Sequence, residues 1–192
     1  EAEIPFVVIA GNHEHPKLRE TGHIFSVFDH LPHIYPIYHG KYETVTISNK
    51  MENILIHAVP QCLSKEEFSK ELQKIKISEN VDYNLLLVHG SVMTIKEFSM
   101  NEFNELFVPV KKLSNTFDYI ALGHFHKFSK VTSKAYYSGA TEALTFADAN
   151  ESKGFIDLNI KPEGIYVDFK ALSTRPMVET QPIQCSHLKI ND

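Results

Sequence analysis

The chain has 192 residues, of which 43% are hydrophobic and 22% charged, and its net charge is −5 at pH 7. This length can bury a core without disulfides, and the two cysteines, Cys62 and Cys185, share no motif spacing. These properties argue against a secreted disulfide scaffold, a membrane span and nucleic-acid binding by bulk charge. We therefore expect a cytoplasmic domain without a membrane segment.

Strands and one helix are expected in the first 60 residues. Residues 4–10 form an apolar run typical of a buried strand, and a polar loop follows through residue 21. Apolar residues at helical spacing predict a helix over residues 24–31, and a proline ends it. Residues 34–38 are expected at a sheet edge because Pro36 cannot donate a ladder hydrogen bond. Residues 42–47 and 54–59 predict a β-hairpin.

The remaining elements change from mixed to all-β along the chain. Ser64 and Glu67 form a capping box, which predicts a helix through about residue 77. Residues 83–89 and 119–122 are expected as strands and 110–113 as a short helix, whereas residues 91–107 have no clear pattern. Further strands are expected at residues 128–132, 135–137, 154–160 and 165–171, with a turn at 161–164.

Three of the expected strands end in the same way, with a glycine beside histidine or asparagine. The residues concerned are Asn12, His13 and Glu14 after Gly11, His89 before Gly90, and His124 and His126 after Gly123. Active sites of α/β proteins collect where strands end at the carboxyl edge of a sheet. Neutral imidazoles and carboxamide oxygens suit Mn²⁺, Zn²⁺, Fe or Ni. We interpret the three stretches as one metal site.

The alternative for any single histidine is a structural role, since a lone histidine at a strand end is more often hydrogen-bonded than metal-bound. Three such stretches in one chain reverse that expectation. His15 adjoins the site and is a candidate for contact with a phosphate, whereas His57 is expected in the core. The histidines expected on the surface are His23, His30, His33 and His39. The Phe and Met side chains of residues 93–107 are expected to pack rather than to line a groove.

In order and strand context, these stretches resemble three motifs of the calcineurin-like metallophosphoesterase superfamily. The matching sequences are Gly11-Asn12-His13-Glu14, Val88-His89-Gly90 and Gly123-His124-Phe125-His126. The resemblance implies an α/β fold, the four-layer α-β-β-α sandwich in which two sheets pack face to face. It also implies that one ion is bound by Asn12, His89 and His124, that a second is bound by His126, and that His13 protonates the leaving oxygen with Glu14 as its partner.

Residues 4–13, 117–126 and 137–142 are most similar to the SbcD-type (Mre-eleven family) DNA-repair nucleases. Glu14 departs from the aspartate usual in that branch and matches the Ser/Thr phosphoprotein phosphatases, which generally lack the equivalent of His126. The nuclease branch implies a DNA substrate and two divalent ions, with Mn²⁺ expected and Mg²⁺, Zn²⁺, Fe and Ni as alternatives. It also implies an SbcC-type (Rad-fifty family) ABC ATPase as partner and a homodimer, for which the apolar face of residues 24–31 is one candidate contact. Such a protein would be nucleoid-associated when it acts on DNA, as an exonuclease or an endonuclease.

Two motifs of the superfamily, Asp-x-His and Gly-Asp-x-x-Asp, do not occur before Gly11. We therefore expect residues 1–172 to form the nuclease domain without its first strands and helices, and residues 173–192 to form an exit linker toward a capping domain. Such a fragment is expected to hold half of the two-metal site and to have little or no activity. The alternatives are an enzyme acting on small nucleotides or phosphoproteins, and a non-catalytic phosphoesterase-fold scaffold.

Overall fold

The computed structural model describes residues 3–14, 16, 22–49, 51–92, 105–109, 111, 116–161 and 163–178. Outside these ranges lie His15, for which a phosphate contact is predicted, most of the stretch 91–107, most of the short helix predicted over 110–113, and residues 179–192. In the described part strands predominate, and the one α-helix there is α1 (Lys65–Gln73). None of the described helices is long and apolar enough to cross a membrane. The elements are compatible with a mixed α/β fold.

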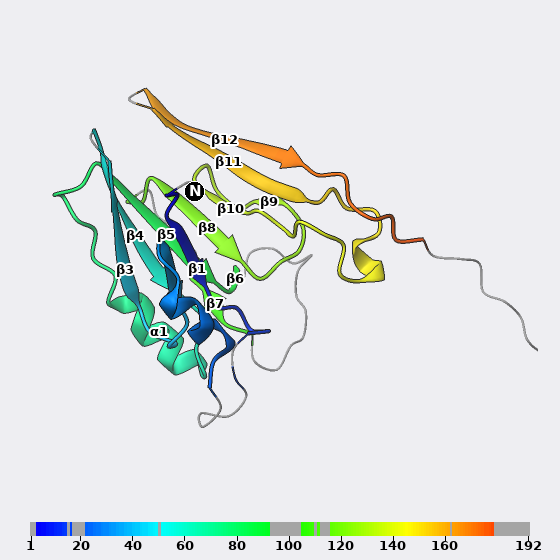
Figure 1. Cartoon of the computed structure of the whole chain (residues 1–192), viewed down its shortest axis with the longest axis horizontal. Coiled ribbons are helices and arrows are strands. Elements are labelled where there is room, and N and C mark those ends of the chain that lie inside the picture. Colours follow the sequence, from blue (N-terminus) through cyan, green and yellow to red (C-terminus); the bar gives the residue numbers. More distant parts are fainter. Residues whose placement is uncertain are drawn as a thin grey trace, which may run out of the picture.

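A six-stranded sheet in the order β3-β4-β5-β8-β10-β9 forms the centre of the molecule (Figure 1). Its strands are β3 (Glu43–Ser48), β4 (Asn53–Val59), β5 (Tyr83–His89), β8 (Tyr119–Gly123), β10 (Ala135–Tyr137) and β9 (Ser129–Lys130). The four inner strands run parallel, and β3 and β9 pair antiparallel at the two edges. The carboxyl ends of the inner strands therefore lie along one edge of the sheet.

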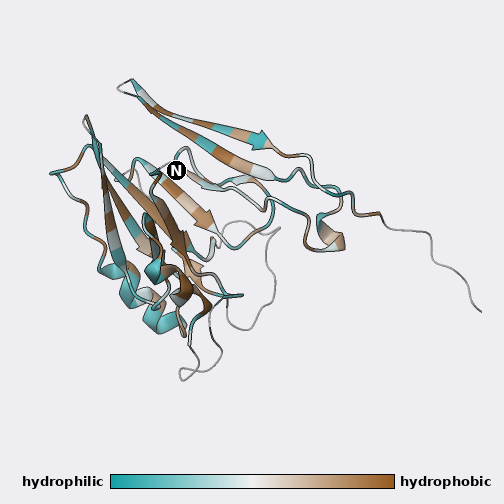
Figure 2. Cartoon of the chain, in the orientation of Figure 1, coloured by the Kyte–Doolittle hydropathy of each residue, from teal (hydrophilic) through white to brown (hydrophobic). Residues whose placement is uncertain are grey.

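The two faces of the sheet are covered by different elements. On one face, Leu86 and Val88 pack in a core with Phe68 and Leu72 of α1. On the other face, Leu85 packs in a second cluster with apolar residues of the hairpin formed by β11 (Gly154–Lys161) and β12 (Gly164–Ala171). Strands buried on both faces need a nearly continuous apolar run, which explains the sequence of β5. Figure 2 shows apolar residues along the central strands and mainly hydrophilic residues over α1.

The capping box confirms the start of α1, because the backbone N–H of Glu67 donates to Ser64 Oγ at 3.1 Å. The helix ends at Gln73, earlier than the predicted residue 77. The helix predicted over residues 24–31 exists as the 3₁₀ helix η1 (Ile24–His30), and none of its residues is buried. Its apolar side chains are exposed or only half-buried, and Phe25 packs edge-on against Tyr38.

Two short parallel pairs of strands lie outside the six-stranded sheet. β1 (Phe6–Ile9) pairs with β2 (Ile34–Ile37), and β6 (Ser91–Val92) pairs with β7 (Phe107–Val108). The 3₁₀ helix η4 (Phe146–Asp148) precedes the β11–β12 hairpin. β1 thus reaches the candidate site from a different sheet than β5 and β8.

His57 is a core histidine with a partner on each ring nitrogen, as predicted. It is fully buried on β4, with Nδ1 2.7 Å from the Tyr42 hydroxyl and Nε2 3.0 Å from Asn84 Oδ1. Because Asn84 Oδ1 only accepts, Nε2 carries the hydrogen and Nδ1 accepts from Tyr42. This histidine stabilises the fold and takes no part in the candidate site.

We expect His57→Leu to lower the free energy of unfolding by about 1–3 kcal/mol, because Tyr42 and Asn84 each lose a buried hydrogen-bond partner. Urea denaturation measures this loss. The matched control is His30→Leu at an exposed position of η1, which should change stability by less than about 0.5 kcal/mol. Equal stability of the two variants would contradict the assigned role.

Candidate metal centre

The stretches that carry the candidate ligands meet at the carboxyl edge of the sheet. His89 at the end of β5 lies in register with Gly123 at the end of β8, and the N–H of Gly90 donates to the Gly123 carbonyl at 3.1 Å. The end of β1 is held nearby, because the N–H of Gln61, just beyond β4, donates to the Ala10 carbonyl at 2.9 Å. Segments far apart in sequence are therefore neighbours here.

His89 contacts both other candidate ligands of the first ion. Its Nε2 is 2.9 Å from Asn12 Oδ1, and the centre of its ring is 5.4 Å from that of His124, with the two rings nearly perpendicular. The backbone N–H of Asn12 also points at His89 Nε2, at 3.3 Å. The structure therefore brings together one carboxamide oxygen and two imidazoles.

Two glycines make room for the His89 ring. A Cβ atom on Gly11 would lie 2.6 Å from His89 Cε1, and one on Gly123 would lie 3.0 Å from His89 Nδ1. The first distance is shorter than any tolerable carbon contact, and the second requires the ring to move. The glycines of the repeated strand–glycine pattern thus have a steric function at this site.

The His89 ring is held in its neutral form. Burial lowers its pKa, and the charges of His124 and His13 lower it further, to about 3. A neutral imidazole has a free lone pair, and this is the form that binds a metal ion. At neutral pH the ring therefore carries a single proton, and one of its two nitrogens presents a lone pair.

His124 has a strained backbone and lies beside a buried carboxylate. Its φ of 125° is in a region that residues with a Cβ rarely adopt, and such strain is most frequent at functional sites. Its Nε2 is 3.8 Å from Glu105 Oε1, and both side chains are more than nine-tenths buried. The Ser91 hydroxyl donates to the same oxygen of Glu105. The ring of His124 is therefore enclosed between His89 and Glu105.

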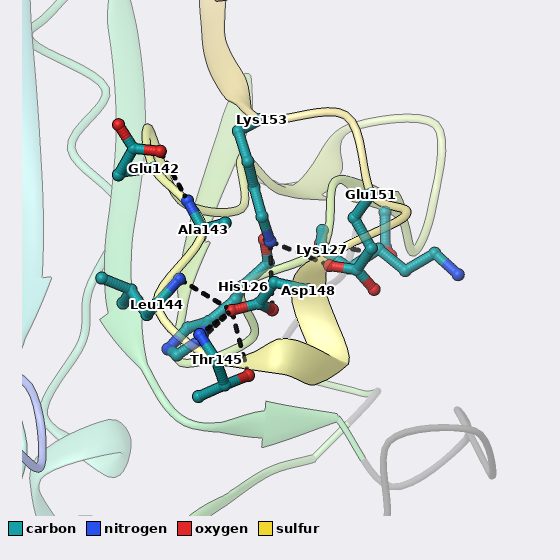
Figure 3. A network of polar contacts seen from close by, with 10 residues as sticks. His126, Lys127, Glu142, Ala143, Leu144, Thr145, Asp148, Glu151 and Lys153 are labelled. Carbon is teal, nitrogen blue, oxygen red and sulfur yellow. Dashed lines mark hydrogen bonds and ion pairs between the residues drawn. The ribbon is translucent and has the colours of Figure 1, made fainter. Parts of the chain in front are cut away.

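The described contacts of His126 are with a second carboxylate rather than with the other three candidate ligands. His126 Nδ1 is 3.7 Å from Asp148 Oδ2 (Figure 3). Burial alone would raise the pKa of Asp148, but the N–H groups of Thr145 and Leu144 and the ammonium of Lys153 lower it to about 2. Asp148 is therefore ionised and faces the His126 ring as an acceptor.

The predicted catalytic residues lie on the surface at the end of β1. His13 and Glu14 are exposed, and Glu14 Oε2 accepts a hydrogen bond from the N–H of Gly11 at 2.9 Å. This contact closes the turn that carries Asn12. Glu14 therefore supports the turn in this structure, and its predicted partnership with His13 remains a prediction.

Glu105, Asp148 and Lys153 were not among the site residues predicted from the sequence. The spacing of Thr145 and Asp148 is that of a helix start, so the capping role of Asp148 was readable from the sequence. Glu105 follows a stretch without periodicity, and nothing local indicates that it contacts His124.

The residues present fit a divalent ion only if the amide of Asn12 takes part. Within the described ranges, no three His, Cys, Asp or Glu side chains gather closely enough to hold an ion. Two ligand atoms at right angles on an octahedral ion are about 3 Å apart. The separation of Asn12 Oδ1 and His89 Nε2 is 2.9 Å, which matches this spacing. The donor set of one amide oxygen and imidazole nitrogens is compatible with Mn²⁺ or Zn²⁺.

No protein-family model matches the chain. It is 26% identical over 159 residues to the DNA double-strand break repair protein Mre11 of Methanococcus maripaludis, which covers 80% of this chain and 41% of that protein. The chain thus spans about two fifths of the length of this curated relative. The similarity supports a distant relationship to a DNA-repair protein of this kind.

We expect Gly11→Ala to lower the free energy of unfolding by about 1–3 kcal/mol, because the new methyl group overlaps the His89 ring. Thermal or urea denaturation measures the effect. Gly22→Ala is the matched control, since a Cβ at Gly22 meets no atom within 4 Å. If both substitutions were equally tolerated, the His89 ring would not be packed as described.

Proposed function

We propose that the chain is part of a DNA-repair nuclease that hydrolyses phosphodiester bonds with divalent metal ions. The observation that carries this proposal is the contact of Asn12 Oδ1 with His89 Nε2 at 2.9 Å, with the His124 ring beside it. A carboxamide and two imidazoles from three distant segments form a donor set suited to a transition-metal ion. The His89 imidazole is held in its neutral form.

In this proposal Asn12, His89 and His124 bind one ion, and His126 binds a second. When bound, the ions would supply activation of water at neutral pH and charge stabilisation for the phosphate. The residues of this chain have separate tasks in the reaction. His13 lies exposed at the end of the same turn, where it protonates the leaving oxygen, and His15 contacts the phosphate.

DNA is proposed as the substrate because of the similarity to a DNA double-strand break repair protein. Because the net charge of the chain is −5, binding of DNA would depend on the ions at the site rather than on bulk positive charge. We also propose that residues 1–172 form the four-layer α-β-β-α sandwich and that residues 173–192 form a linker. The intact protein would be a homodimer in the cytoplasm with a Rad-fifty-type ATPase as its partner.

The chain contains no Asp-x-His and no Gly-Asp-x-x-Asp sequence. We therefore assign to it three ligands of one ion and one ligand of the other. Three neutral ligands hold an ion weakly, so binding and catalysis are best tested separately. Binding is measured on the 192-residue chain, and catalysis on the complete gene product that contains it.

We expect the chain to bind one Mn²⁺ ion, and Asn12→Ala or His89→Ala to weaken this binding at least about tenfold, since each removes one ligand. Isothermal titration calorimetry or electron paramagnetic resonance measures the affinity. His30→Ala, which removes an exposed imidazole on η1, should leave it unchanged. Failure of the unsubstituted chain to bind Mn²⁺, or equal binding by all variants, would refute the proposed centre.

We expect the complete gene product to cleave linear DNA in the presence of Mn²⁺, and His13→Ala to lower kcat about 100-fold by removing the proton donor. His30→Ala again serves as the control. Parallel assays with bis(p-nitrophenyl) phosphate distinguish a nuclease from a small-substrate enzyme. Hydrolysis of the small ester without cleavage of DNA would overturn the assignment of DNA as substrate.

A further inference from the structure

We propose that Glu105 and Asp148 are positioning residues that fix the two rings of the Gly123-His124-Phe125-His126 stretch. Glu105 orients the Nε2–H of His124 and thereby places its lone pair on Nδ1, and Asp148 orients the Nδ1–H of His126 and thereby places its lone pair on Nε2. This inference rests on the proposed function, since it concerns how the candidate ligands present their lone pairs.

Glu105 is a buried carboxylate whose position is set by the short strands β6 and β7. It lies two residues before β7 and is 7% exposed. One of its oxygens accepts from the hydroxyl of Ser91, which is 2% exposed, and the same oxygen lies 3.8 Å from His124 Nε2. The carboxylate is therefore held on the Nε2 side of the ring.

Asp148 is held by more contacts than Glu105. Its Oδ2 accepts hydrogen bonds from the N–H groups of Leu144 and Thr145 at 3.0 and 2.9 Å and lies 3.7 Å from His126 Nδ1. Its Oδ1 lies 3.1 Å from Lys153 Nζ. Figure 3 shows this carboxylate between the His126 ring and the Lys153 ammonium. The ring thus faces an acceptor that cannot turn away.

Lys153 fixes the backbone of His126 as well. Its side chain is fully buried, and Nζ donates to the His126 carbonyl at 2.9 Å and to Glu151 Oε2 at 2.9 Å. The N–H of Ala140 donates to the same carbonyl at 3.0 Å. One cation therefore fixes both the main chain of His126 and the carboxylate that faces its ring.

The two carboxylates select opposite ring nitrogens. A neutral imidazole carries one N–H and one lone pair, and an ionised carboxylate only accepts, so the nitrogen facing it carries the hydrogen. The lone pair is then on Nδ1 in His124 and on Nε2 in His126. Both distances are about 1 Å longer than a charge-assisted hydrogen bond, so each carboxylate orients the N–H through its charge rather than through a formed hydrogen bond. Carboxylates behind metal-binding histidines act in this way in other metal sites.

A purely structural role makes a different prediction. Asp148 would then serve only as the cap of η4, and Glu105 only as the partner of Ser91. Removing their charge would change stability without changing the tautomer of either histidine. The tautomers can be measured in the metal-free chain, independently of metal binding and of activity.

The experiment is long-range ¹H–¹⁵N NMR of the ¹⁵N-histidine-labelled chain in the presence of a chelator. We expect the Nε2–H form for His124 and the Nδ1–H form for His126. Glu105→Gln should convert only His124, and Asp148→Asn only His126, to a mixture of tautomers, because the new amide can donate as well as accept. Unchanged tautomers in both variants would overturn the proposal.

Three controls separate positioning from loss of structure. Glu71→Gln removes an equally buried carboxylate on α1, 8% exposed, and should change neither histidine. Thr145→Ala removes a capping hydroxyl that donates to Asp148 but keeps its carboxylate, so the His126 tautomer should persist. Glu105→Asp retains the charge and should restore a single His124 tautomer, which a merely structural role does not predict.

Mn²⁺ titration of the same variants separates this inference from the proposed function. We expect Glu105→Gln to weaken Mn²⁺ binding about 10- to 100-fold and Glu71→Gln to leave it unchanged. Fixed tautomers in a chain that binds no Mn²⁺ would refute the proposed function and retain the positioning role. Mn²⁺ binding that is equal in Glu105→Gln and the unsubstituted chain would refute the positioning role and retain the proposed function.

Discussion

The contact between the His89 ring and the Asn12 side chain is the constraint on which the candidate site depends. It joins the ends of β1 and β5, which belong to different sheets, and it requires Gly11 and Gly123 to lack side chains. The parallel register of β5 with β8 then places His124 next to His89 without any local signal in the loop between them. The position of the site therefore follows from sheet topology. Glycine is required at positions 11 and 123 because the His89 ring occupies the space of a side chain there.

The same constraint has a cost in stability. The backbone of His124 adopts a φ of 125° that a residue with a Cβ avoids, and the lowered pKa of His89 reduces stability as the pH falls below about 6.5. The hydrophobic clusters on both faces of the sheet offset this cost. By contrast, His57 is also buried but has two hydrogen-bond partners and ordinary geometry. His57 therefore stabilises the fold, whereas the fold holds His89 in the neutral form that suits metal binding.

The sequence predicts those features that arise from local patterns. The strands β5 and β10 have the predicted bounds, the capping box begins α1, and His57 is a satisfied core residue. The predictions fail where distant contacts decide the outcome. Residues 24–31 have helical spacing, but with no buried residue the segment forms a 3₁₀ helix over Ile24–His30. The contact of Glu105 with His124 joins the segment before β7 to the end of β8, and no residue pattern within either segment specifies it.

The Gly123-His124-Phe125-His126 stretch therefore does not by itself determine how its histidines would bind a metal ion. His124 and His126 flank the buried Phe125, and each ring contacts a carboxylate from a different part of the chain. A metal ligand must present a lone pair in a fixed direction, and a histidine alone does not determine which nitrogen carries it. At His126 that choice depends on Asp148, whose charge is balanced by a fully buried Lys153. The segment from η4 to β11 is thus as much a part of the site as the strand that carries the histidines.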